Sequence, residues 1–554
     1  MVRNLSGKKS DYLGIITQGS LSQGLEMRLA SSHSVEDLRV GRFVVVEGSS
    51  TRFFSMLVDV SLAAENLSLL SNPPLEDDFA LSVLSTSSTY GIVKIQPMLM
   101  LEKAQDRQTE LRPVKTIPSH FSRVYEASHA DFALVFGQED KADPHNFSFN
   151  IGQPLNMDTQ ICINLERFVE RSNGIFGKSG TGKSFLTRIF LCGIINRDVA
   201  SVLVFDMHNE YGWQALSESK STPRVKGLKQ LFGSQVAVFS LDQASSKARG
   251  VPDVHELFIG YNQIEIEDLD LLKAELALSE ATLENAYIVK EKFGPDWIST
   301  LLDMSLEEIE EFTLSNKGHP VAIKTLQRRL TTVVQKISYL RPRVTHNYIE
   351  EILQFIEAGK HVVLEFGKQN NLLSYMLATN IITRRIHEAY VRRTELYMAD
   401  PEKRAAPRKL TIVVEEAHKF LSPQVAHQTI FGVIAREMRK YSVTLLVVDQ
   451  RPSGIDPEIL SQIGTRVTAL LNDEKDIDAV FTGVSGSQAL RTVLAQLDPK
   501  QQALVLGYAV PMPVVVRVRP FDTEFYKAVA GNKVDDPEQR KLNASRAKEE
   551  IFGT

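Results

Sequence analysis

The first hundred or so residues show the short apolar and polar alternation of β-strands. Residues 25–29 alternate strictly, and short apolar runs cover residues 43–46 and 53–58. Strands of this length, separated by glycine and serine turns, are typical of a small barrel or sandwich. We therefore predict an N-terminal β-barrel over residues 1–110, with the apolar segment 91–95 as its closing strand.

Prolines punctuate the chain after this segment. Pro97, Pro113 and Pro118 follow one another at intervals, and proline cannot donate a hydrogen bond to a strand ladder. We interpret them as the exit from the barrel into an irregular connector over residues 111–150.

A second pattern, of uninterrupted apolar runs, begins after residue 150. Such runs are typical of parallel strands that are buried on both faces of a sheet. They cover residues 202–206, 236–241, 361–366, 410–414, 443–448 and 466–471. We predict an α/β core built from residues 151–253 and 358–520. Two further runs, 503–506 and 514–518, are predicted as edge strands.

Between the two parts of the core the hydrophobic period changes from that of strands to that of helices. Apolar residues recur at helical spacing through residues 254–357, for example at Leu269, Leu272 and Leu276,. We predict that this segment is a helical insertion. Residues 521–554 are rich in charge and form a predicted C-terminal extension.

The composition is that of an ordinary folded protein. Of 554 residues, 43% are hydrophobic and 24% are charged, which is enough to build several cores,. The formal charge of −5 neither demands nor excludes nucleic acid, because a local basic surface decides phosphate binding,. Cys162 and Cys192 lie in apolar patterns without metal-ligand spacing, so we expect reduced core residues,. The chain shows no signal-peptide pattern and no run of about 18 apolar residues, so we expect a cytoplasmic protein without a membrane partner.

The strongest chemical signal is the phosphate-loop pattern G-x-x-x-x-G-K-S/T, which residues 177–184 fill as GKSGTGKS,. The loop opens a segment of helical periodicity, whose N-terminal dipole favours an anion. We expect its backbone to cradle the phosphates of ATP, with Lys183 at the β- and γ-phosphates and Ser184 on Mg²⁺. The nucleotide-binding candidates of this loop are Gly177, Ser179, Gly180, Thr181, Gly182, Lys183 and Ser184.

A second motif supplies the acids that a phosphate loop needs. The apolar run 410–414 ends in Glu415 and Glu416. Ligands of parallel sheets bind at the carboxyl ends of the strands, which places both acids beside the phosphate loop. Glu415 is the candidate Mg²⁺ ligand, through the water shell of the ion, and Glu416 is the candidate to polarise the attacking water. The alternative is that both are solvated residues at a helix start.

Four further motifs occur in a fixed order with the phosphate loop. They are FDMHNEY at 205–211, EEAH at 415–418, IAREMRKY at 434–441 and QRPS at 450–453. Together with the predicted barrel and helical insertion, they closely resemble the HerA-like hexameric DNA-translocating ATPases, which are related to the FtsK motors. The resemblance covers nearly the whole chain. It implies a RecA-like P-loop core and a homo-hexameric ring with an ATP site at each subunit boundary.

The resemblance also implies roles for individual residues. Glu416 would activate water, and Gln450 would sense the γ-phosphate. Arg436 or Arg439 would be an arginine finger that reaches into the neighbouring subunit, although a solvated helix face or a salt bridge to Glu437 would explain these arginines equally. The family pattern D-x-x-x-E-Y falls on Asp206, Glu210 and Tyr211. Its role is site-proximal, with Glu210 as a nucleotide-binding candidate.

Two functions fit the resemblance. The first is an ATP-driven translocase on double-stranded DNA that feeds ends to a NurA-type nuclease during end resection and repair. The alternative is a ring that scaffolds and regulates an antiphage effector protein, either Sir2-like or a nuclease. A conjugative DNA motor is disfavoured because the sequence offers no membrane segment.

Two features depart from the simple interpretation. Asp449 precedes Gln450 where a small hydroxyl residue is common in the family, and it adds a negative charge near the phosphates. Residues 532–535 match the N-K-x-D pattern that selects guanine, but they follow a helical pattern and not an apolar strand,. We therefore predict ATP and not GTP as the nucleotide.

Overall fold

The computed structural model describes residues 12–65, 71, 89–103, 109–140, 142–155, 157–216, 224–369, 371–426, 429–484, 488–499 and 501–531. The N-K-x-D pattern at 532–535 lies outside these residues. The chain forms two compact units. The first comprises Met1–Asn164, Gly177–Gly182 and Thr465–Arg519, and the second comprises Leu165–Phe176, Lys183–Gly464 and Pro520–Thr554.

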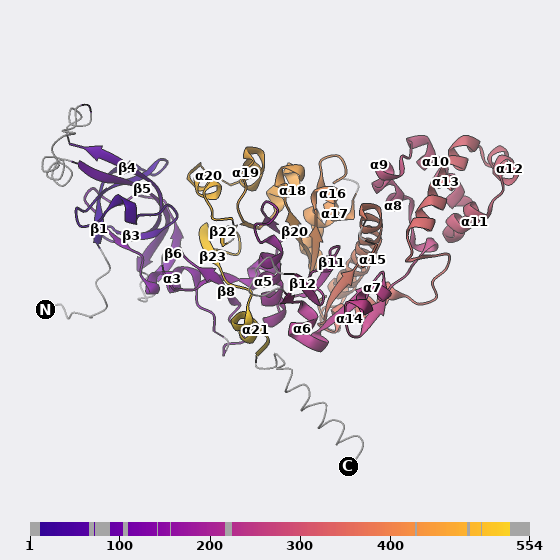
Figure 1. Cartoon of the computed structure of the whole chain (residues 1–554), viewed down its shortest axis with the longest axis horizontal. Coiled ribbons are helices and arrows are strands. Elements are labelled where there is room, and N and C mark those ends of the chain that lie inside the picture. Colours follow the sequence, from indigo (N-terminus) through magenta and orange to yellow (C-terminus); the bar gives the residue numbers. More distant parts are fainter. Residues whose placement is uncertain are drawn as a thin grey trace, which may run out of the picture. The chain divides into compact units, whose positions relative to one another are not determined.

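The N-terminal sheet of the first unit closes into a barrel, drawn in indigo and violet in Figure 1. Its strands are β1 (Tyr12–Ser20), β2 (Gly24–Leu29), β3 (Phe43–Glu47), β4 (Arg52–Ala64), β5 (Thr89–Lys103), β6 (Thr109–Pro113) and β7 (Arg123–Glu126). They follow the order β2-β1-β7-β3-β4-β5-β6, and β5 also pairs with β2. Alternate apolar side chains such as Met27, Val44 and Val93 fill the interior, as the period of a half-buried strand requires.

Two details of the barrel differ from the sequence prediction. Pro97 lies inside β5 opposite Ser55, where the pairing with β4 shifts register between Phe54 and Ser55. A bulge is one of the places where a sheet tolerates a residue without an N–H group, so Pro97 does not mark an exit. In addition, β7 lies between β1 and β3, so the expected connector contributes a strand to the barrel.

Another set of strands in the first unit pairs antiparallel throughout, in the order β21-β22-β23-β8-β9. These strands are β8 (Ser148–Gln153), β9 (Ile161–Asn164), β21 (Thr465–Thr468), β22 (Gln502–Gly507) and β23 (Val514–Val518). The predicted edge strands 503–506 and 514–518 are thus β22 and β23. The helices of this unit include α3 (His129–Phe136), α19 (Glu474–Val480) and α20 (Gln488–Ala495).

The second unit is built around a parallel sheet with the order β15-β14-β18-β11-β19-β20-β10. Its strands are β10 (Asn173–Phe176), β11 (Ser201–Asp206), β14 (Val236–Ser240), β15 (Val254–Glu256), β18 (His361–Glu365), β19 (Leu410–Glu415) and β20 (Val443–Asp449). All residues of β11, β14, β18, β19 and β20 are buried, which explains why these strands are continuous apolar runs in the sequence.

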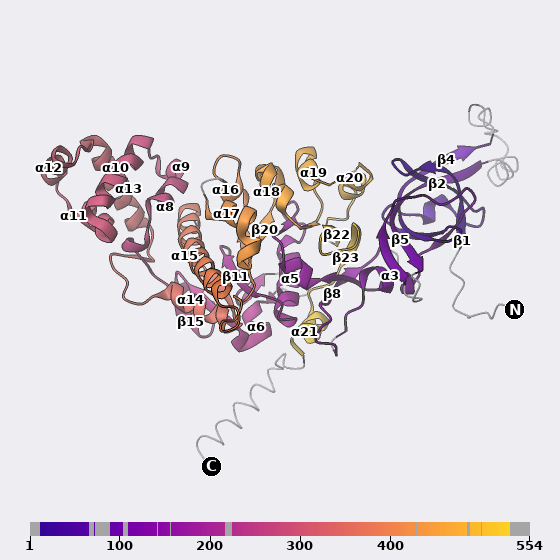
Figure 2. The same ribbon diagram turned by 180° about the vertical axis from the view of Figure 1, so that it is seen from behind.

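Helices pack against this sheet or against one another and complete the core. They include α5 (Lys183–Asn196), α6 (Leu228–Phe232), α7 (Gln243–Ala248), α14 (Tyr348–Glu357), α15 (Leu372–Ala399), α17 (Ile430–Glu437), α18 (Pro457–Gln462) and α21 (Thr523–Ala530). Figure 2 shows the long helix α15 running beside the sheet. Within the described residues, no helix combines the length and the apolar character needed to span a membrane.

The order of the parallel strands brings acids from distant parts of the sequence to one edge. β20 lies between β19 and β10, the strand that leads into the phosphate loop. Asp449 pairs in register with Phe176, and Asp206 pairs with Glu365. Glu415 lies opposite the residue before Asp449. Because the strands are parallel, all of these ends lie at the same edge of the sheet.

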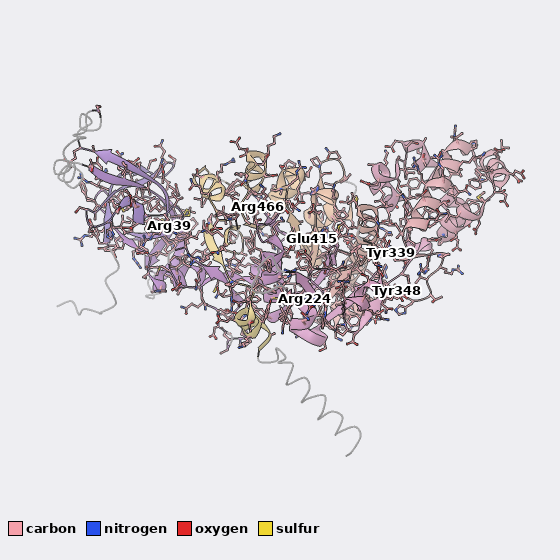
Figure 3. All side chains as sticks on the ribbon, viewed as in Figure 1. Arg39, Arg224, Tyr339, Tyr348, Glu415 and Arg466 are labelled. Atoms are coloured by element: carbon pink, nitrogen blue, oxygen red, sulfur yellow. The ribbon has the colours of Figure 1, made fainter. Side chains whose placement is uncertain are left out.

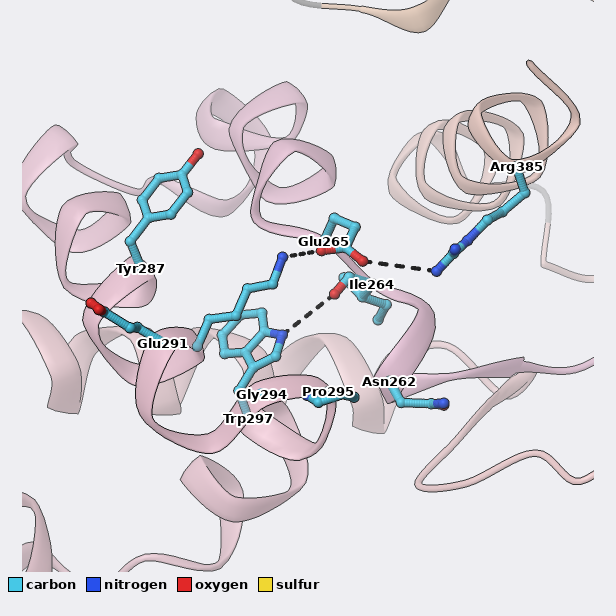
Figure 4. A pocket seen from close by; sticks show the side chains of 10 residues that line it. Asn262, Ile264, Glu265, Tyr287, Glu291, Gly294, Pro295, Trp297 and Arg385 are labelled. Atoms are coloured by element: carbon cyan, nitrogen blue, oxygen red, sulfur yellow. Dashed lines mark hydrogen bonds and ion pairs between the residues drawn. The ribbon is translucent and has the colours of Figure 1, made fainter. Parts of the chain in front are cut away.

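The middle of the segment 254–357 is helical, whereas its ends belong to the core, because β15 pairs with β14 and α14 packs against β18. It contains α8 (Ile266–Leu271), α9 (Lys273–Leu276), α10 (Glu280–Phe293), α11 (Trp297–Asp303), α12 (Leu306–Asn316) and α13 (Pro320–Lys336). A cavity of about 650 Å³ lies within it and is also lined by Arg385 of α15. The Glu265 carboxylate lies in this cavity and forms ion pairs with Lys290 and Arg385. Figure 4 labels Glu265 and Arg385. Trp297 Nε1 donates a hydrogen bond to the Ile264 carbonyl at 3.4 Å.

Candidate active site

The phosphate loop joins β10 to α5, as the pattern predicts. Gly180 and Gly182 have φ angles of 76° and 88°, and a Cβ atom at either position would meet no other atom within 4 Å. Glycine is therefore required there by the backbone conformation and not by lack of space. Thr181 Oγ1 donates a hydrogen bond to the Lys178 carbonyl at 2.6 Å and closes the turn of the loop.

Lys183 and Ser184 form the first turn of α5. Burial lowers the pKa of Lys183, whereas the negative charges of Glu416, Asp449 and Glu415 act in the opposite direction. Lys183 therefore lies in the field of three acids from β19 and β20. The structure thus brings the lysine of the first motif to the acids of the second, within one unit.

Glu415 ends β19 and is buried; Figure 3 labels it. Tyr211 Oη donates a hydrogen bond to Glu415 Oε1 at 2.8 Å. Tyr375 Oη bonds the main chain of Glu415 instead, at 3.1 Å from the carbonyl and 3.2 Å from the amide. Burial raises the pKa of the Glu415 carboxyl to about 7, although the Tyr211 hydrogen bond opposes this shift. Glu415 Oε2 is buried and has no hydrogen-bond partner among the described residues.

The D-x-x-x-E-Y pattern is a turn that places Tyr211. The carboxylate of Asp206 accepts hydrogen bonds from the backbone N–H groups of Glu210, Tyr211 and Gly212 at 2.7, 2.8 and 3.1 Å. Arg188 of α5 is buried and donates to the Glu210 carbonyl at 2.9 Å. Burial and the nearby Glu365 and Glu415 raise the pKa of Asp206 to about 7. The turn thus links the helix after the phosphate loop to the acid at the end of β19.

Glu416 follows the strand in a left-handed backbone conformation, with a φ angle of 49°. For a residue other than glycine this conformation is uncommon, and it is often found at functional sites. Gln450 Nε2 donates a hydrogen bond to Glu416 Oε1 at 3.0 Å. Glu416 Oε2 lies 3.7 Å from Nδ1 of His418. Glu416 and Gln450, predicted from separate motifs, are therefore in direct contact.

The remaining predicted residues lie in three places. Glu210 is half-exposed, and its carboxylate lies 3.6 Å from Arg188 Nη2. Arg436 is half-buried in the last turn of α17. Arg439 belongs to the 3-10 turn Met438–Tyr441, and its side chain lies outside the described part of the chain.

Some contributors to this site were not assigned a role from the sequence. Tyr375 lies 40 residues before Glu415 on α15, and nothing in its neighbourhood signals the contact. His418 belongs to the EEAH motif, but its partner Asp449 lies on another strand. Arg188 could have been recognised as a candidate from the sequence, because Arg188 and Lys183 are the charged residues of an otherwise uncharged helix.

A phosphate-loop pattern between a buried strand and a helix, with its lysine beside acids on the ends of neighbouring parallel strands, defines a P-loop ATPase,. Comparison with known proteins identifies its family. The family model for the central domain of the HerA helicase matches residues 149–386. The DNA double-strand break repair helicase HerA of Sulfolobus acidocaldarius is 35% identical over 503 residues, which cover 88% of this chain and 90% of that protein. The chain belongs to the HerA family.

More distant proteins are also similar to this chain. The HerA helicase of Pyrococcus furiosus is 24% identical over 443 residues, which cover 76% of this chain and 77% of that protein. Among solved structures, VirB4 of Thermoanaerobacter pseudethanolicus superimposes with a TM-score of 0.42 at 13% identity, over 68% of this chain and 97% of that one.

Proposed function

We propose that this protein is an ATP-driven motor that translocates double-stranded DNA, acting as a homo-hexamer in DNA double-strand break repair. The observation that supports it best is the direct contact between Glu416 and Gln450 in the electrostatic field of Lys183. It gives one site a candidate phosphate-binding cation, a candidate water-activating acid and a candidate γ-phosphate sensor. The relatives are named DNA double-strand break repair helicases, and these names support DNA as the substrate and repair as the cellular process.

In the proposed reaction each residue acts at a defined position. Lys183 neutralises the β- and γ-phosphates of ATP, and Glu416 accepts a proton from the attacking water. Gln450 reports the γ-phosphate to Glu416 through their shared hydrogen bond. Ser184 and Glu415 would hold Mg²⁺, and the unpartnered Glu415 Oε2 fits this role. When bound, the ion would neutralise charge that develops on the phosphoryl oxygens.

The ring and its partner belong to the same proposal. Arg436 or Arg439 would complete the site of the neighbouring subunit, and a NurA-type nuclease would receive the DNA. The nuclease partner rests on the family resemblance alone.

The proposal is tested by measuring ATP hydrolysis with and without linear duplex DNA, together with the native mass. A hexamer whose hydrolysis is strongly stimulated by DNA would support the motor. A hexamer whose hydrolysis ignores DNA would contradict the motor and favour a ring that scaffolds an effector protein.

The site assignment is tested by two substitutions in the same assay. Lys183→Ala should abolish both ATP binding and hydrolysis, because it removes the charge at the phosphates. Glu416→Gln should bind ATP normally and hydrolyse it hardly at all. Near-normal hydrolysis by Glu416→Gln would show that another group activates the water.

A further inference from the structure

Asp449, at the end of β20, forms a closely bonded pair with His418. The Asp449 side chain is fully buried. It accepts hydrogen bonds from the backbone N–H groups of His418 and Arg451 at 2.6 and 2.7 Å. His418 Nδ1 also lies 2.9 Å from Asp449 Oδ2 and 3.1 Å from Oδ1. A carboxylate only accepts hydrogen bonds, so Nδ1 carries a proton and donates it to Asp449.

The same imidazole nitrogen faces the candidate water-activating acid. Nδ1 of His418 lies 3.7 Å from Glu416 Oε2, and Gln450 Nε2 bonds Glu416 Oε1 at 3.0 Å. Both oxygens of Glu416 thus have a neighbour of fixed position. The hydrogen bond to Asp449 raises the pKa of His418 in spite of its partial burial, so the imidazole is favoured as a cation beside Glu416.

Capping alone would not require this arrangement. Two backbone N–H groups are satisfied by any short side chain with an acceptor oxygen, and asparagine would serve. A buried carboxylate is costly unless it is paired and bonded. The contact with the imidazole of His418 therefore explains why a charged residue stands at position 449. The imidazole in turn lies next to Glu416.

We propose that Asp449 and His418 form a positioning pair for Glu416: Asp449 fixes the orientation of the imidazole, and the imidazole fixes the Glu416 carboxylate for water activation. The inference rests on the proposed function, since it needs Glu416 to be the water-activating group. Neither residue touches the nucleotide in this mechanism. Both affect the rate through the position of one carboxylate.

The test compares kcat, KM and nucleotide affinity for His418→Ala, His418→Asn and Asp449→Asn. Misplacing a catalytic group by about 1 Å can cost about 100-fold in rate. We expect both His418→Ala and Asp449→Asn to lower kcat by about 10- to 100-fold. His418→Ala should leave KM and the affinity for a fluorescent ATP analogue unchanged within about twofold. Asp449→Asn also removes a negative charge that acts on Lys183, so its nucleotide affinity should not fall. His418→Asn keeps an N–H donor near the position of Nδ1 and should recover most of the rate.

A double variant separates positioning from independent effects. Because Asp449 acts through His418, the combination His418→Ala with Asp449→Asn should be no slower than His418→Ala alone. Asp456→Asn is the matched control, because Asp456 is also buried but caps α18 through the amides of Glu458 and Ile459. Because asparagine caps a helix about as well as aspartate, Asp456→Asn should change thermal stability little and leave kcat unchanged.

Three results would overturn the inference. They are unchanged kcat in His418→Ala, losses that multiply in the double variant, or a fall in kcat that comes with an equal loss of nucleotide affinity. The proposed function fails separately, through Glu416→Gln. If Glu416→Gln is inactive while His418→Ala is normal, only the positioning pair is refuted.

Discussion

Three acids of the candidate site are buried at the ends of neighbouring strands, and each has different partners. Asp206 accepts three backbone N–H groups, Glu365 bonds Ser246 and Arg249, and Glu415 bonds Tyr211. Burial nevertheless raises the pKa values of Asp206 and Glu415 to about 7. Nearby negative charges add to the shift, from Glu365 and Glu415 at Asp206 and from Glu210 and Glu416 at Glu415. A cation near these acids would therefore be bound more strongly as the pH rises above neutrality.

The hydroxyl of Tyr211 gives a prediction at the scale of one atom. Its hydrogen bond opposes the upward shift of the Glu415 pKa, so Tyr211→Phe should raise that pKa further. A metal-binding carboxylate must be deprotonated. The acid limb of the pH profile of ATP hydrolysis should therefore move to higher pH, and the Mg²⁺ concentration for half-maximal activity should rise by about 10- to 100-fold.

The matched control for Tyr211→Phe is Tyr375→Phe. Tyr375 is equally buried, but its hydroxyl bonds the main chain of Glu415 and not the carboxylate. Tyr375→Phe should therefore leave the Mg²⁺ requirement unchanged. Equal shifts in both variants would show that general loosening of the site, and not the carboxylate hydrogen bond, is responsible.

At the scale of elements, a buried polar link fastens the helical insertion to α15. Asp268 of α8 is fully buried and accepts hydrogen bonds from Asn380 Nδ2 at 2.7 Å and Arg384 Nη2 at 2.8 Å. Burial raises the pKa of Asp268, and the Arg384 charge opposes the shift. The next residue, Arg385, reaches Glu265 at 3.8 Å in the more open setting of Figure 4.

Arg384→Met should therefore destabilise the junction of the insertion and α15 by about 3–5 kcal/mol, since it leaves a buried carboxylate without its cation. Arg385→Met should cost less than about 1 kcal/mol. Hydrogen exchange of the α8 amides would measure both losses of stability.

The loss in Arg384→Met should also depend on pH. Without Arg384, the pKa of Asp268 rises further above its unfolded value, so the folded state binds a proton more readily and the loss of stability should be smaller at pH 5 than at pH 8. A loss that is equal for the two variants would contradict this account.

The sequence predicts elements better than it predicts contacts. The apolar runs at 202–206, 236–241 and 443–448 correspond closely to β11, β14 and β20, because strands buried on both faces leave a continuous apolar signal,. The interpretation of Pro97 as an exit from the barrel is wrong, because the bulge that accommodates this proline depends on the partner strand β4. The bond between His418 and Asp449 joins residues 31 positions apart, and only the order of the parallel strands reveals it.

At the scale of the whole molecule, the ring can be tested through one side chain. An arginine finger contributes on the order of 10³–10⁵ in rate in other nucleotide hydrolases. If Arg436 or Arg439 acts across a subunit boundary, its alanine variant should bind ATP and fail to hydrolyse it. Mixed hexamers of this variant with Lys183→Ala should regain activity, because an intact phosphate loop then meets an intact arginine.

The control for this mixing experiment is a mixture of Lys183→Ala with Glu416→Gln. Both substitutions affect the same site of one subunit, so no neighbour can supply the missing group and activity should not return. Normal hydrolysis by both arginine variants, or no recovery in hexamers of verified composition, would show that the site is completed in another way.

Because the backbone at Glu416 is left-handed, the residue that best stabilises the fold at this position differs from the residue that best supports turnover. A residue other than glycine held in this conformation costs about 1 kcal/mol or more, and Glu416 has a φ angle of 49°. If all variants at position 416 were ranked by melting temperature and again by ATP hydrolysis, glycine should rank near the top of the first scale and at the bottom of the second. Selection for heat resistance alone would thus favour glycine and lose the candidate water-activating acid, whereas selection for turnover would keep the strained glutamate.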